Sequence, residues 1–471
     1  MKLKDLLENN AVTSIGDTEI TSVTDDTRKV KSGGLFFCIK GGNFDGHSAA
    51  AEMLEKGAAA VVCEHDLGFG DRQIITSDTR RLYGEACAAW FGHPEKKMTF
   101  IGVTGTNGKT TTTNIIKHIL MSTGHKTGLI GTIQNEIGDE ILHTDNTTPF
   151  AFEYMEVLAK MADAGCEYVV MEVSSFALVQ KRIGSTHFKL AVFTNLTQDH
   201  LDYHKDMEDY YQAKKFLFDM CDTAIINIDD DYGRRLFNEV NCSKLSFSVK
   251  ENADYFADNI IIKSTGSSFV LNKKTAIKSP IPGMFNVSNI TGAFAVCREL
   301  GIDSVQAIAD YNGVKGRCEV IPTGRDFTVI CDYAHTPDAI ENILKSVKEY
   351  TENRLICLFG CGGNRDSAKR PKMAQSAAKY ADRLIVTSDN PRNEVPEKII
   401  EDILKGLEKT DIPYDIVVDR KEAIFYGLQI AEKGDIIVLA GKGHEYYQIL
   451  AGMKHIHFDE REIVAEGLKL L

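Results

Sequence analysis

Apolar residues along this chain form short runs that alternate with segments of helical periodicity. Phe100 to Val103 is an apolar run typical of a buried strand, and the apolar residues of 115–120 recur at helical spacing. The same alternation continues to the end of the chain. Strands separated by helices predict an α/β fold with mainly parallel, doubly wound sheets, whose ligands gather at the carboxyl ends of the strands.

The alternation also predicts three domains. A length of 471 residues agrees with that number, because a domain usually takes about 100–200 residues. We expect a small α/β domain at 1–97, a central domain at 98–322 and a C-terminal Rossmann-like domain at 323–471. In the last of these, four apolar runs each lead into a polar, glycine-rich tip, which predicts that these strand ends face a site.

Composition and charge narrow the class of protein. Hydrophobic residues make up 43% and charged residues 26%, which is ordinary for a soluble globular protein. The net charge of -13 argues against a surface that wraps nucleic acid. No apolar run approaches the length of a membrane span, and the N-terminus has no signal-peptide core. The 11 cysteines lack metal-site spacing. We therefore expect a cytoplasmic protein with buried thiols, no membrane contact and a monomeric state.

The candidate chemistry starts after the first central strand. There a turn bracketed by Gly105 and Gly108 leads into Lys109 and Thr110 at the start of a predicted helix. Backbone N–H groups at such a turn point at phosphate, the lysine adds charge, and the hydroxyl can bind Mg²⁺. A turn that only joins strand to helix would explain the glycines but not the Lys-Thr pair. The stretch therefore predicts a nucleoside triphosphate site.

Polar residues at other central strand ends suggest metal chemistry. Glu172 follows one apolar run, and Asp199-His200 follows another. Mg²⁺ prefers oxygen ligands and is usually shared between one or two carboxylates and substrate phosphates. Glu172 can supply such a ligand and His200 an imidazole. Alternatively, Glu172 caps the next helix and His200 is a core histidine, but the nearby phosphate loop favours the metal interpretation.

Three further residues are candidates, and two of them, Arg317 and Asn289, allow two interpretations each. Lys214 lies on a predicted helix, 207–219, beside a second lysine, which by itself indicates a solvated face. Arg317 lies in a predicted hinge, where it can stabilise a transferring phosphoryl group or pair with Glu319 on the surface. Asn289 can cap a helix or bind a nucleotide base.

The sequence from Asp389 to Arg392 suggests an amino-acid pocket. Pro391 fixes the turn, Asn390 offers amide donors and an acceptor, and Arg392 offers a planar fork for a carboxylate. With Arg365 and Glu445, this set would present two cations and one anion to a zwitterion. Turn chemistry alone also accounts for Asp-Asn-Pro.

Several motifs together resemble those of the Mur ligases of peptidoglycan synthesis. They are Gly-Thr-Asn-Gly-Lys-Thr (105–110), Glu-Val-Ser-Ser (172–175), Thr-Asn-Leu-Thr-Gln-Asp-His-Leu-Asp (194–202), Asp-Tyr-Ala-His-Thr-Pro-Asp (332–338) and Gly-Lys-Gly-His-Glu (441–445). Asp-Thr-Arg (26–28) and Asn-Thr-Thr-Pro (146–149) favour the members that add the third residue of the stem peptide. The resemblance covers nearly the whole chain.

The resemblance implies a role for each matching residue. The ATP site would comprise Gly105, Thr106, Asn107, Gly108, Lys109, Thr110, Thr111, Asn289, Arg317 and Asp332. Mg²⁺ would be bound by Thr110, Glu172, His200 and Lys214, the last as a carbamate, which replaces the surface interpretation of that lysine. The nucleotide-sugar peptide would contact Thr27, Asn43, Thr147, Thr148, Ser174, Gln180 and Arg182. The amino-acid substrate would contact Arg365, Asp389, Asn390, Pro391, Arg392, Gly441 and Glu445.

The resemblance also implies the reaction. The chain would use ATP and Mg²⁺ to join meso-diaminopimelate to UDP-N-acetylmuramoyl-L-alanyl-D-glutamate through an acyl phosphate, with Lys109, Glu172, His200, Lys214 and Arg317 as catalytic residues. Arg392 would pair with the carboxylate that diaminopimelate has and lysine lacks. Three positions depart from the family pattern: Phe176 stands for the usual His, Asn364 for Asp and Lys315 for Pro.

Other functions remain open from the sequence. One is a related amide ligase, either a lysine-adding or otherwise divergent Mur-type enzyme or an enzyme similar to folylpolyglutamate synthetase. Arg392 argues against lysine, and the complete first domain argues against the folate type. A different class is a nucleotide-binding module without ligase activity, which would have no need for Glu172, His200 and Lys214 together.

Overall fold

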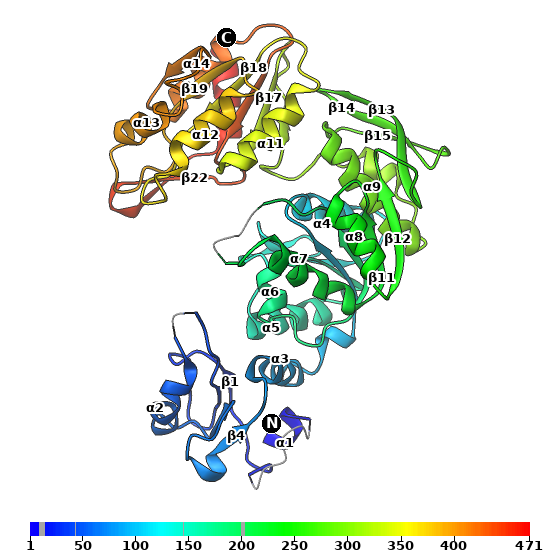
Figure 1. Cartoon of the computed structure of the whole chain (residues 1–471), viewed down its shortest axis with the longest axis vertical. Helices are drawn as coiled ribbons and strands as arrows, with labels where there is room; N and C mark the ends of the chain where they lie inside the picture. The colour runs from blue at the N-terminus through cyan, green and yellow to red at the C-terminus, as the bar shows by residue number, and fades with distance from the viewer. Residues whose placement is uncertain (9–14, 43, 145, 199–202) are drawn as a thin grey trace. The chain divides into compact units, whose positions relative to one another are not determined.

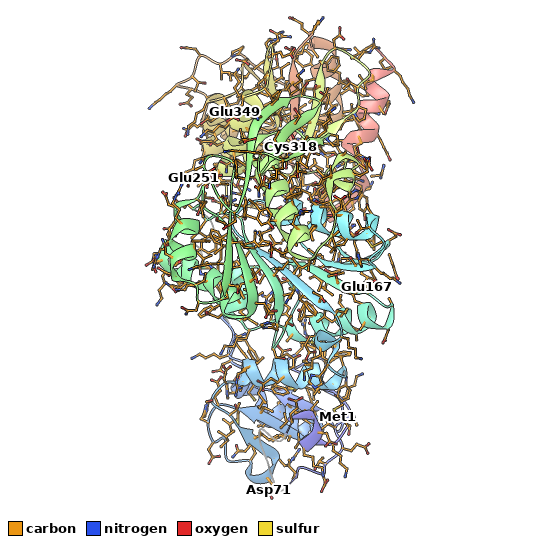
Figure 2. All side chains as sticks on the ribbon, turned by 90° about the vertical axis from the view of Figure 1, so that its right-hand side faces the viewer. Met1, Asp71, Glu167, Glu251, Cys318 and Glu349 are labelled. Atoms are coloured by element: carbon orange, nitrogen blue, oxygen red, sulfur yellow. The ribbon has the colours of Figure 1, made fainter. Side chains whose placement is uncertain are left out.

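The chain divides into two compact units. The first comprises Met1–Phe247 and Gly292–Ile302, and the second comprises Ser248–Thr291 and Asp303–Leu471. Met1, Asp71 and Glu167 belong to the first unit, and Glu251, Cys318 and Glu349 to the second (Figure 2). The structure is a computed structural model that describes residues 1–8, 15–42, 44–144, 146–198 and 203–471.

The first unit begins with a small parallel sheet in the order β1-β2-β3-β4. Alternate side chains of β2 and β3 pack on opposite faces, as the pleat requires: Phe36 and Val61 lie against α2, whereas Phe37 and Val62 belong to the larger core. The elements are α1 (Leu3–Leu6), β1 (Val23–Thr24), β2 (Leu35–Phe37), η1 (Gly46–Ala49), α2 (Ala50–Glu55), β3 (Ala60–Cys63), η2 (Gly70–Arg72), β4 (Gln73–Ile75), α3 (Thr79–Trp90) and η3 (Pro94–Lys96).

The central sheet of the first unit has the order β12-β11-β10-β5-β9-β6-β7-β8. From β12 to β6 all neighbours are parallel, and β7 and β8 add an antiparallel edge. The strands are β5 (Thr99–Thr104), β6 (Thr127–Ile130), β7 (Asn135–Ile137), β8 (Glu140–Leu142), β9 (Tyr168–Glu172), β10 (Phe188–Phe193), β11 (Cys221–Asn227) and β12 (Ser243–Ser248). The helices are α4 (Lys109–Ser122), α5 (Ala151–Asp163), α6 (Ser175–Val179), α7 (Met207–Lys215), η4 (Phe216–Asp219) and α8 (Asp231–Glu239).

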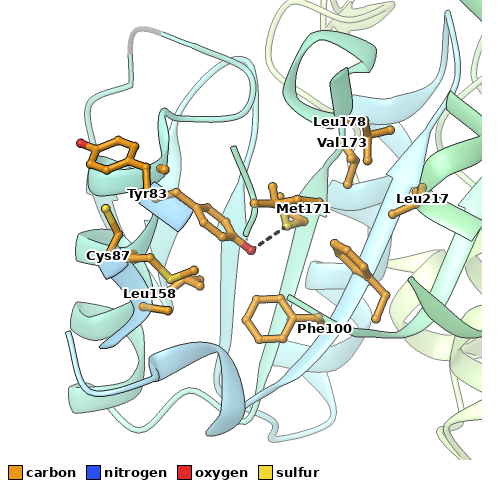
Figure 3. Close-up of a cluster of buried hydrophobic side chains, with 14 of the residues drawn as sticks. Tyr83, Cys87, Phe100, Leu158, Met171, Val173, Leu178 and Leu217 are labelled. Atoms are coloured by element: carbon orange, nitrogen blue, oxygen red, sulfur yellow. Dashed lines mark hydrogen bonds between the residues drawn. The ribbon is translucent and has the colours of Figure 1, made fainter. Parts of the chain in front are cut away.

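One apolar core joins the small sheet to the central sheet. Tyr83 and Cys87 of α3 lie in the same buried cluster as Leu158 of α5 and Met171 of β9 (Figure 3). The hydroxyl of Tyr154 contacts the Met171 sulfur at 3.5 Å. Because the cluster is continuous, the small sheet and the central sheet form one packed body within the first unit.

The second unit contains a six-stranded sheet in the order β16-β17-β21-β18-β19-β20, parallel from β17 to β20. Helices α11, α12 and α13 cover one face, and α14 lies on the other (Figure 1). Phe359 and Val438 pack beneath the first three helices, and Leu358 and Leu439 pack beneath α14 and α15. The strands are β16 (Glu319–Ile321), β17 (Thr328–Asp332), β18 (Leu355–Phe359), β19 (Arg383–Val386), β20 (Tyr414–Ile416) and β21 (Ile436–Ala440). The helices are α11 (Pro337–Lys348), α12 (Lys369–Ala378), α13 (Pro396–Leu404), α14 (Arg420–Ile430) and α15 (Glu460–Leu468).

Antiparallel strands complete the second unit. β13 (Tyr255–Lys263) pairs with β14 (Gly266–Leu271), which pairs with β15 (Thr275–Ser279). A hairpin pairs β22 (Tyr447–Leu450) with β23 (Lys454–His457), joined by η5 (Ala451–Met453). Helix α9 (Met284–Glu299) starts in the second unit and ends in the first, and α10 (Val305–Ala309) follows it.

Three expectations can be compared with these elements. The helix predicted at 207–219 is α-helical only to Lys215 and ends in a 3₁₀ turn, a common way to close a helix. The cysteines are free, and each of them except the partly exposed Cys242 is buried. Within the described residues, no helix has the length and apolar character needed to cross a membrane.

Candidate functional site

The phosphate loop of the first unit lies between β5 and α4. Gly105 has φ +149°, and a Cβ atom there would lie 1.9 Å from Thr194 Oγ1, so the backbone can take this path only with glycine. Lys109 Nζ donates to the carbonyls of Gly105 and Thr106, each at 2.9 Å. The end of β10 supports the loop from the other side, because Asn195 Oδ1 accepts the N–H of Asn107 at 2.9 Å. The loop is therefore shaped by its own residues and by the next strand.

Glu172 ends β9 directly beside this loop. Its carboxylate is 1% exposed and accepts the Thr110 hydroxyl at 3.1 Å. Thr132, which follows β6, donates both its N–H and its hydroxyl to the same carboxylate, each at 2.9 Å. A Cβ at Gly131 would approach Glu172 Oε1 to 2.7 Å, so the glycine leaves room for the carboxylate. The structure thus places two predicted metal ligands, Thr110 and Glu172, in contact.

Lys214 of α7 is 2% exposed, so it does not lie on a solvated helix face. Its Nζ donates to the Gly105 carbonyl at 2.9 Å and lies 4.6 Å from the centre of the Tyr210 ring. The Tyr210 hydroxyl lies 3.3 Å from the Thr106 hydroxyl. The interpretation of this lysine as part of a solvated helix face is wrong, because Lys214, in the last turn of α7, packs against the phosphate loop.

The residues predicted to contact a peptide substrate form a connected set next to Glu172. Thr148 donates its hydroxyl to the Glu172 carbonyl at 2.9 Å and accepts the Ser174 N–H at 3.2 Å. Arg182 donates to the Thr148 carbonyl at 3.0 Å and to Gln180 Oε1 at 2.8 Å. The Thr147 hydroxyl lies 3.0 Å from that of Thr132. This set therefore links the end of β9 with the segment before α5.

Other predicted residues of the first unit either have neighbours other than Glu172 or lie outside the described residues. Gln180 and Arg182 also line a pocket with Arg80 and Tyr83 of α3, and Thr27 lies in the turn after β1. Phe176, which stands for the family's histidine, packs on Tyr203 with ring centres 4.1 Å apart. Asn43 and His200 lie outside the described residues.

In the second unit, Asp332 ends β17 and organises the segment that holds Arg317. Its carboxylate accepts the N–H groups of Cys318 at 2.7 Å and Ala334 at 2.8 Å. Burial raises the pKa of Asp332, while the Arg317 charge and these N–H groups oppose the rise. The Arg317 guanidinium lies 5.2 Å from the Tyr333 ring centre. Glu319 pairs instead with Arg461 at 2.6 Å, so the proposed surface pair with Arg317 is not what the structure shows.

The Asp389–Arg392 turn packs against the loop after β21. Asn390 donates Nδ2 to Glu445 Oε2 at 3.0 Å. Gly441 has φ +124°, and a Cβ there would lie 2.6 Å from Asp389 Oδ2, so the two strand ends approach closely. The Arg392 guanidinium donates to the Gly363 carbonyl at 2.9 Å. Exposed Arg365 lies near it, since both side chains border the space above Gly362. The structure therefore brings the predicted cations and the anion into one loop cluster.

Three supporting residues were missed in the sequence. Thr132 follows an apolar run and a glycine, so the strand-end rule that found Glu172 applies to it as well. Lys442 is 0% exposed and binds Asn390 and Glu445. Arg420, which is fully buried with Glu460, donates to the Ala440 carbonyl at 2.9 Å, one residue before Gly441. No local sequence signal identifies Arg420, because its partners are distant in the chain.

Comparison with known proteins connects these two regions to one family. Family models match in order: "Mur ligase family, catalytic domain" at residues 19–89, "Mur ligase middle domain" at 103–297 and "Mur ligase, glutamate ligase domain" at 316–443. A UDP-N-acetylmuramoyl-L-alanyl-D-glutamate--2,6-diaminopimelate ligase of Clostridium acetobutylicum is 45% identical over 485 residues, covering 100% of both chains. A ligase of the same name from Caldanaerobacter subterraneus is 45% identical and covers 99% of both.

Solved structures agree with the sequence relatives. A structure of a UDP-N-acetylmuramoyl-L-alanyl-D-glutamate--2,6-diaminopimelate ligase, 31% identical, superposes with a TM-score of 0.76 over 100% of this chain and 99% of that one. A MurF structure from Acinetobacter baumannii has a TM-score of 0.62 at 18% identity, which shows a shared fold. The predicted α/β class with three successive domains is confirmed, whereas the boundaries at 97 and 322 remain predictions.

Proposed function

The chain belongs to the Mur ligase family, and from this we propose that it joins meso-diaminopimelate to UDP-N-acetylmuramoyl-L-alanyl-D-glutamate with consumption of ATP. Similarity to the diaminopimelate ligases named above, over the full length of both chains, carries this proposal. The presence of Arg392 beside Asn390 and Glu445 supports the choice of amino acid, because that cluster offers a cation to a carboxylate and an anion to an ammonium group.

The phosphate loop would hold the triphosphate of ATP. The N–H groups at the start of α4 and the Lys109 side chain would bind the phosphates, because a helix N-terminus binds anions favourably. The glutamyl carboxylate of the peptide substrate would attack the γ-phosphorus, so that a carboxylate–phosphorus bond forms and the bond to ADP breaks. Lys109 would stabilise charge on the transferring group. The network of Thr148, Ser174 and Arg182 would position the peptide.

The donor set around Glu172 fits Mg²⁺. Thr110 and Glu172 contribute oxygen atoms 3.1 Å apart, and Mg²⁺ typically combines one or two protein oxygens with water and phosphate oxygens. His200, and Lys214 if it is carbamylated, would complete the ligands. A bound Mg²⁺ supplies neutralisation of phosphate charge. Within the described residues, no group of three or more His, Cys, Asp or Glu side chains forms a site for a metal.

The second step would take place with groups of the second unit. The amine of diaminopimelate would attack the acyl carbon, and an amide bond would form as the nitrogen loses a proton to water or phosphate. Phosphate would leave with the electron pair of the broken carbon–oxygen bond. Arg392 and Arg365 would hold the carboxylate of the far end of the amino acid, and Glu445 its ammonium group. Arg317 would stabilise negative charge on the phosphate.

Phosphate release measured with diaminopimelate and with lysine tests this function. We expect release to require ATP, the UDP-linked dipeptide and an amino acid together, with diaminopimelate strongly preferred. Arg392→Ala should lower kcat/KM for diaminopimelate about 10- to 100-fold, the size of one lost charge-assisted contact, with little effect on lysine. A nucleotide-binding module would release no phosphate, and a preference for lysine in the unmodified enzyme would contradict the choice of amino acid.

A further inference from the structure

Lys442 is a buried charge within the amino-acid pocket that the reaction described above leaves unused. It lies in the loop between β21 and β22 with its side chain fully buried. Its Nζ donates to Glu445 Oε2 at 2.7 Å and to Asn390 Oδ1 at 2.9 Å. A buried ammonium group is tolerated only when such partners compensate the loss of water.

The three side chains form a closed triangle that fixes each of them. Asn390 Nδ2 donates to the same Glu445 Oε2 at 3.0 Å, and Asn390 Oδ1 also accepts the Ile449 N–H at 2.9 Å. Since Oδ1 receives two donors, the amide can lie in only one orientation. Lys442 and Asn390 therefore both engage Oε2 of Glu445.

The other oxygen of Glu445 is the one left for a ligand. Among the described residues, no hydrogen bond to Oε1 is formed, and the Glu445 side chain is 15% exposed, so it reaches solvent. The carbonyl of Asn390 and the guanidinium of Arg392 both border Gly362, which places this guanidinium close to one corner of the triangle. A substrate carbon that carries a carboxylate and an ammonium group could therefore pair its carboxylate with Arg392 and its ammonium group with Glu445.

We infer that Lys442 is a positioning residue that holds Glu445 with Oε1 directed at the ammonium group on the far, non-reacting end of the amino-acid substrate. The inference rests on the proposed function and adds a residue to its substrate selection. Lys442 compensates the Glu445 charge before the substrate arrives, and with the substrate bound, Glu445 lies between two ammonium groups. Without Lys442, the carboxylate would be free to turn and Asn390 would lose one of its two donors.

Two acceptor amino acids that differ by one group give the test. 2-Aminopimelate lacks the far ammonium group of diaminopimelate and keeps both carboxylates. We expect the unmodified enzyme to favour diaminopimelate over 2-aminopimelate in kcat/KM, and we expect Lys442→Met to reduce that ratio about tenfold, equivalent to one well-placed polar contact. The KM values for ATP and the UDP-linked dipeptide should stay within about twofold.

Arg354→Met is the matched control. Arg354 pairs with buried Asp435 at 2.6 Å, just before β21, whereas Lys442 follows the end of the same strand. This control also removes a cation from a partly buried ion pair, so it tests whether lost stability alone changes the ratio. We expect the ratio to stay at the value of the unmodified enzyme.

Lys442→Gln and Lys442→Arg provide further variants, so that a folding failure of the methionine variant does not end the test. Arginine should recover part of the ratio because it keeps the charge, and glutamine should recover less. An unchanged ratio in any folded Lys442→Met or Lys442→Gln protein overturns the inference while leaving the function intact. An unmodified enzyme that does not accept diaminopimelate overturns the proposed function instead.

Discussion

Glu172 shows how one side chain is prepared for metal chemistry in this protein. Its carboxylate is buried at the end of β9, yet it receives hydrogen bonds from Thr110 and Thr132 that compensate for the lost water. The same bonds fix its orientation next to the phosphate loop. A carboxylate that is buried, fixed and adjacent to a hydroxyl of that loop is suited to share a divalent cation with phosphate.

Replacement of Glu172 by glutamine removes the negative charge of the side chain but keeps its shape, so it tests the role of the charge alone. We expect Glu172→Gln to fold, because the amide keeps the volume and one acceptor oxygen, and to lower kcat at least about 100-fold, because the negative charge is lost beside the phosphates. Phosphate release measured over a range of Mg²⁺ concentrations checks this, with a shift of the curve to higher Mg²⁺.

Thr132→Ser serves as the control for Glu172. Serine keeps both donors to the carboxylate, its N–H and its hydroxyl, so we expect activity within about threefold of the unmodified enzyme. If Glu172→Gln were equally active, the carboxylate would have a structural role only.

Strand β21 of the second unit runs from a buried ion pair at its start to residues of the proposed amino-acid site at its end. Asp435 precedes it and pairs with Arg354, and Gly441 and Lys442 follow it. Its side chains pack on both faces of the sheet, so it is rigid along its length. A central strand of this kind stabilises the fold at one end and presents pocket residues at the other.

The ion pair before β21 makes stability depend on pH. Burial raises the pKa of Asp435, but hydrogen bonds from Arg354 and from the Glu432 N–H outweigh it and leave the pKa below the ordinary 3.8. The unfolded chain therefore binds the proton first, and this contribution to stability is lost as the pH falls below 3.8. Arg354→Met should cost about 3 kcal/mol at pH 7, and the difference from the unmodified enzyme should shrink at pH 3.

Urea unfolding followed by circular dichroism at both pH values measures this difference. Lys405→Met is a suitable comparison, because Lys405 pairs with Asp402 on the surface and its side chain is 63% exposed. We expect it to leave the urea midpoint nearly unchanged, because exposed ion pairs contribute little to stability. A constant difference between Arg354→Met and the unmodified enzyme from pH 7 to pH 3 would show that Asp435 does not carry the effect.

Features set by neighbouring residues could be predicted from the sequence. The phosphate loop and Glu172 depend on a strand, a turn and a helix start that adjoin in the chain, so their pattern is visible locally. Lys214 is different: its burial depends on Gly105, 109 residues away, and only the family resemblance indicated it. Lys442 and Arg420 were missed for a similar reason, since Asn390, which binds Lys442, and Ala440, which binds Arg420, lie far from them in the chain.

At the scale of the whole molecule, the proposed reaction draws on both units. The phosphate loop, Glu172 and Lys214 belong to the first, and Arg317, Arg392 and Glu445 belong to the second. The three family models match successive parts of the chain in the same order as the predicted domains, although the described structure forms two compact units. Within the first unit, the continuous core explains why the N-terminal sheet does not separate from the central one.

The last part of the chain can be tested as a folding unit. Both apolar cores of the six-stranded sheet consist of buried residues between Cys318 and Val464. Among the partly buried apolar side chains of the described structure that pack against these cores, Ile262 is the one that lies outside residues 316–471. About 150 residues suffice for a stable core. We therefore expect the fragment 316–471 to unfold cooperatively in urea, with native-like circular dichroism, and to release no phosphate from ATP because it lacks the phosphate loop.

The fragment 323–471, which starts at the predicted domain boundary, is the matched comparison. It lacks β16 and with it Cys318, Ile321 and the ion pair between Glu319 and Arg461, so one edge of the sheet and part of each core are lost. We expect it to be less stable than 316–471 by several kcal/mol, since each large buried side chain removed costs about 2–5 kcal/mol. Equal stability of the two fragments would show that residue 323 is a sufficient start for the folded domain. An unfolded 316–471 would show that this core depends on the rest of the second unit.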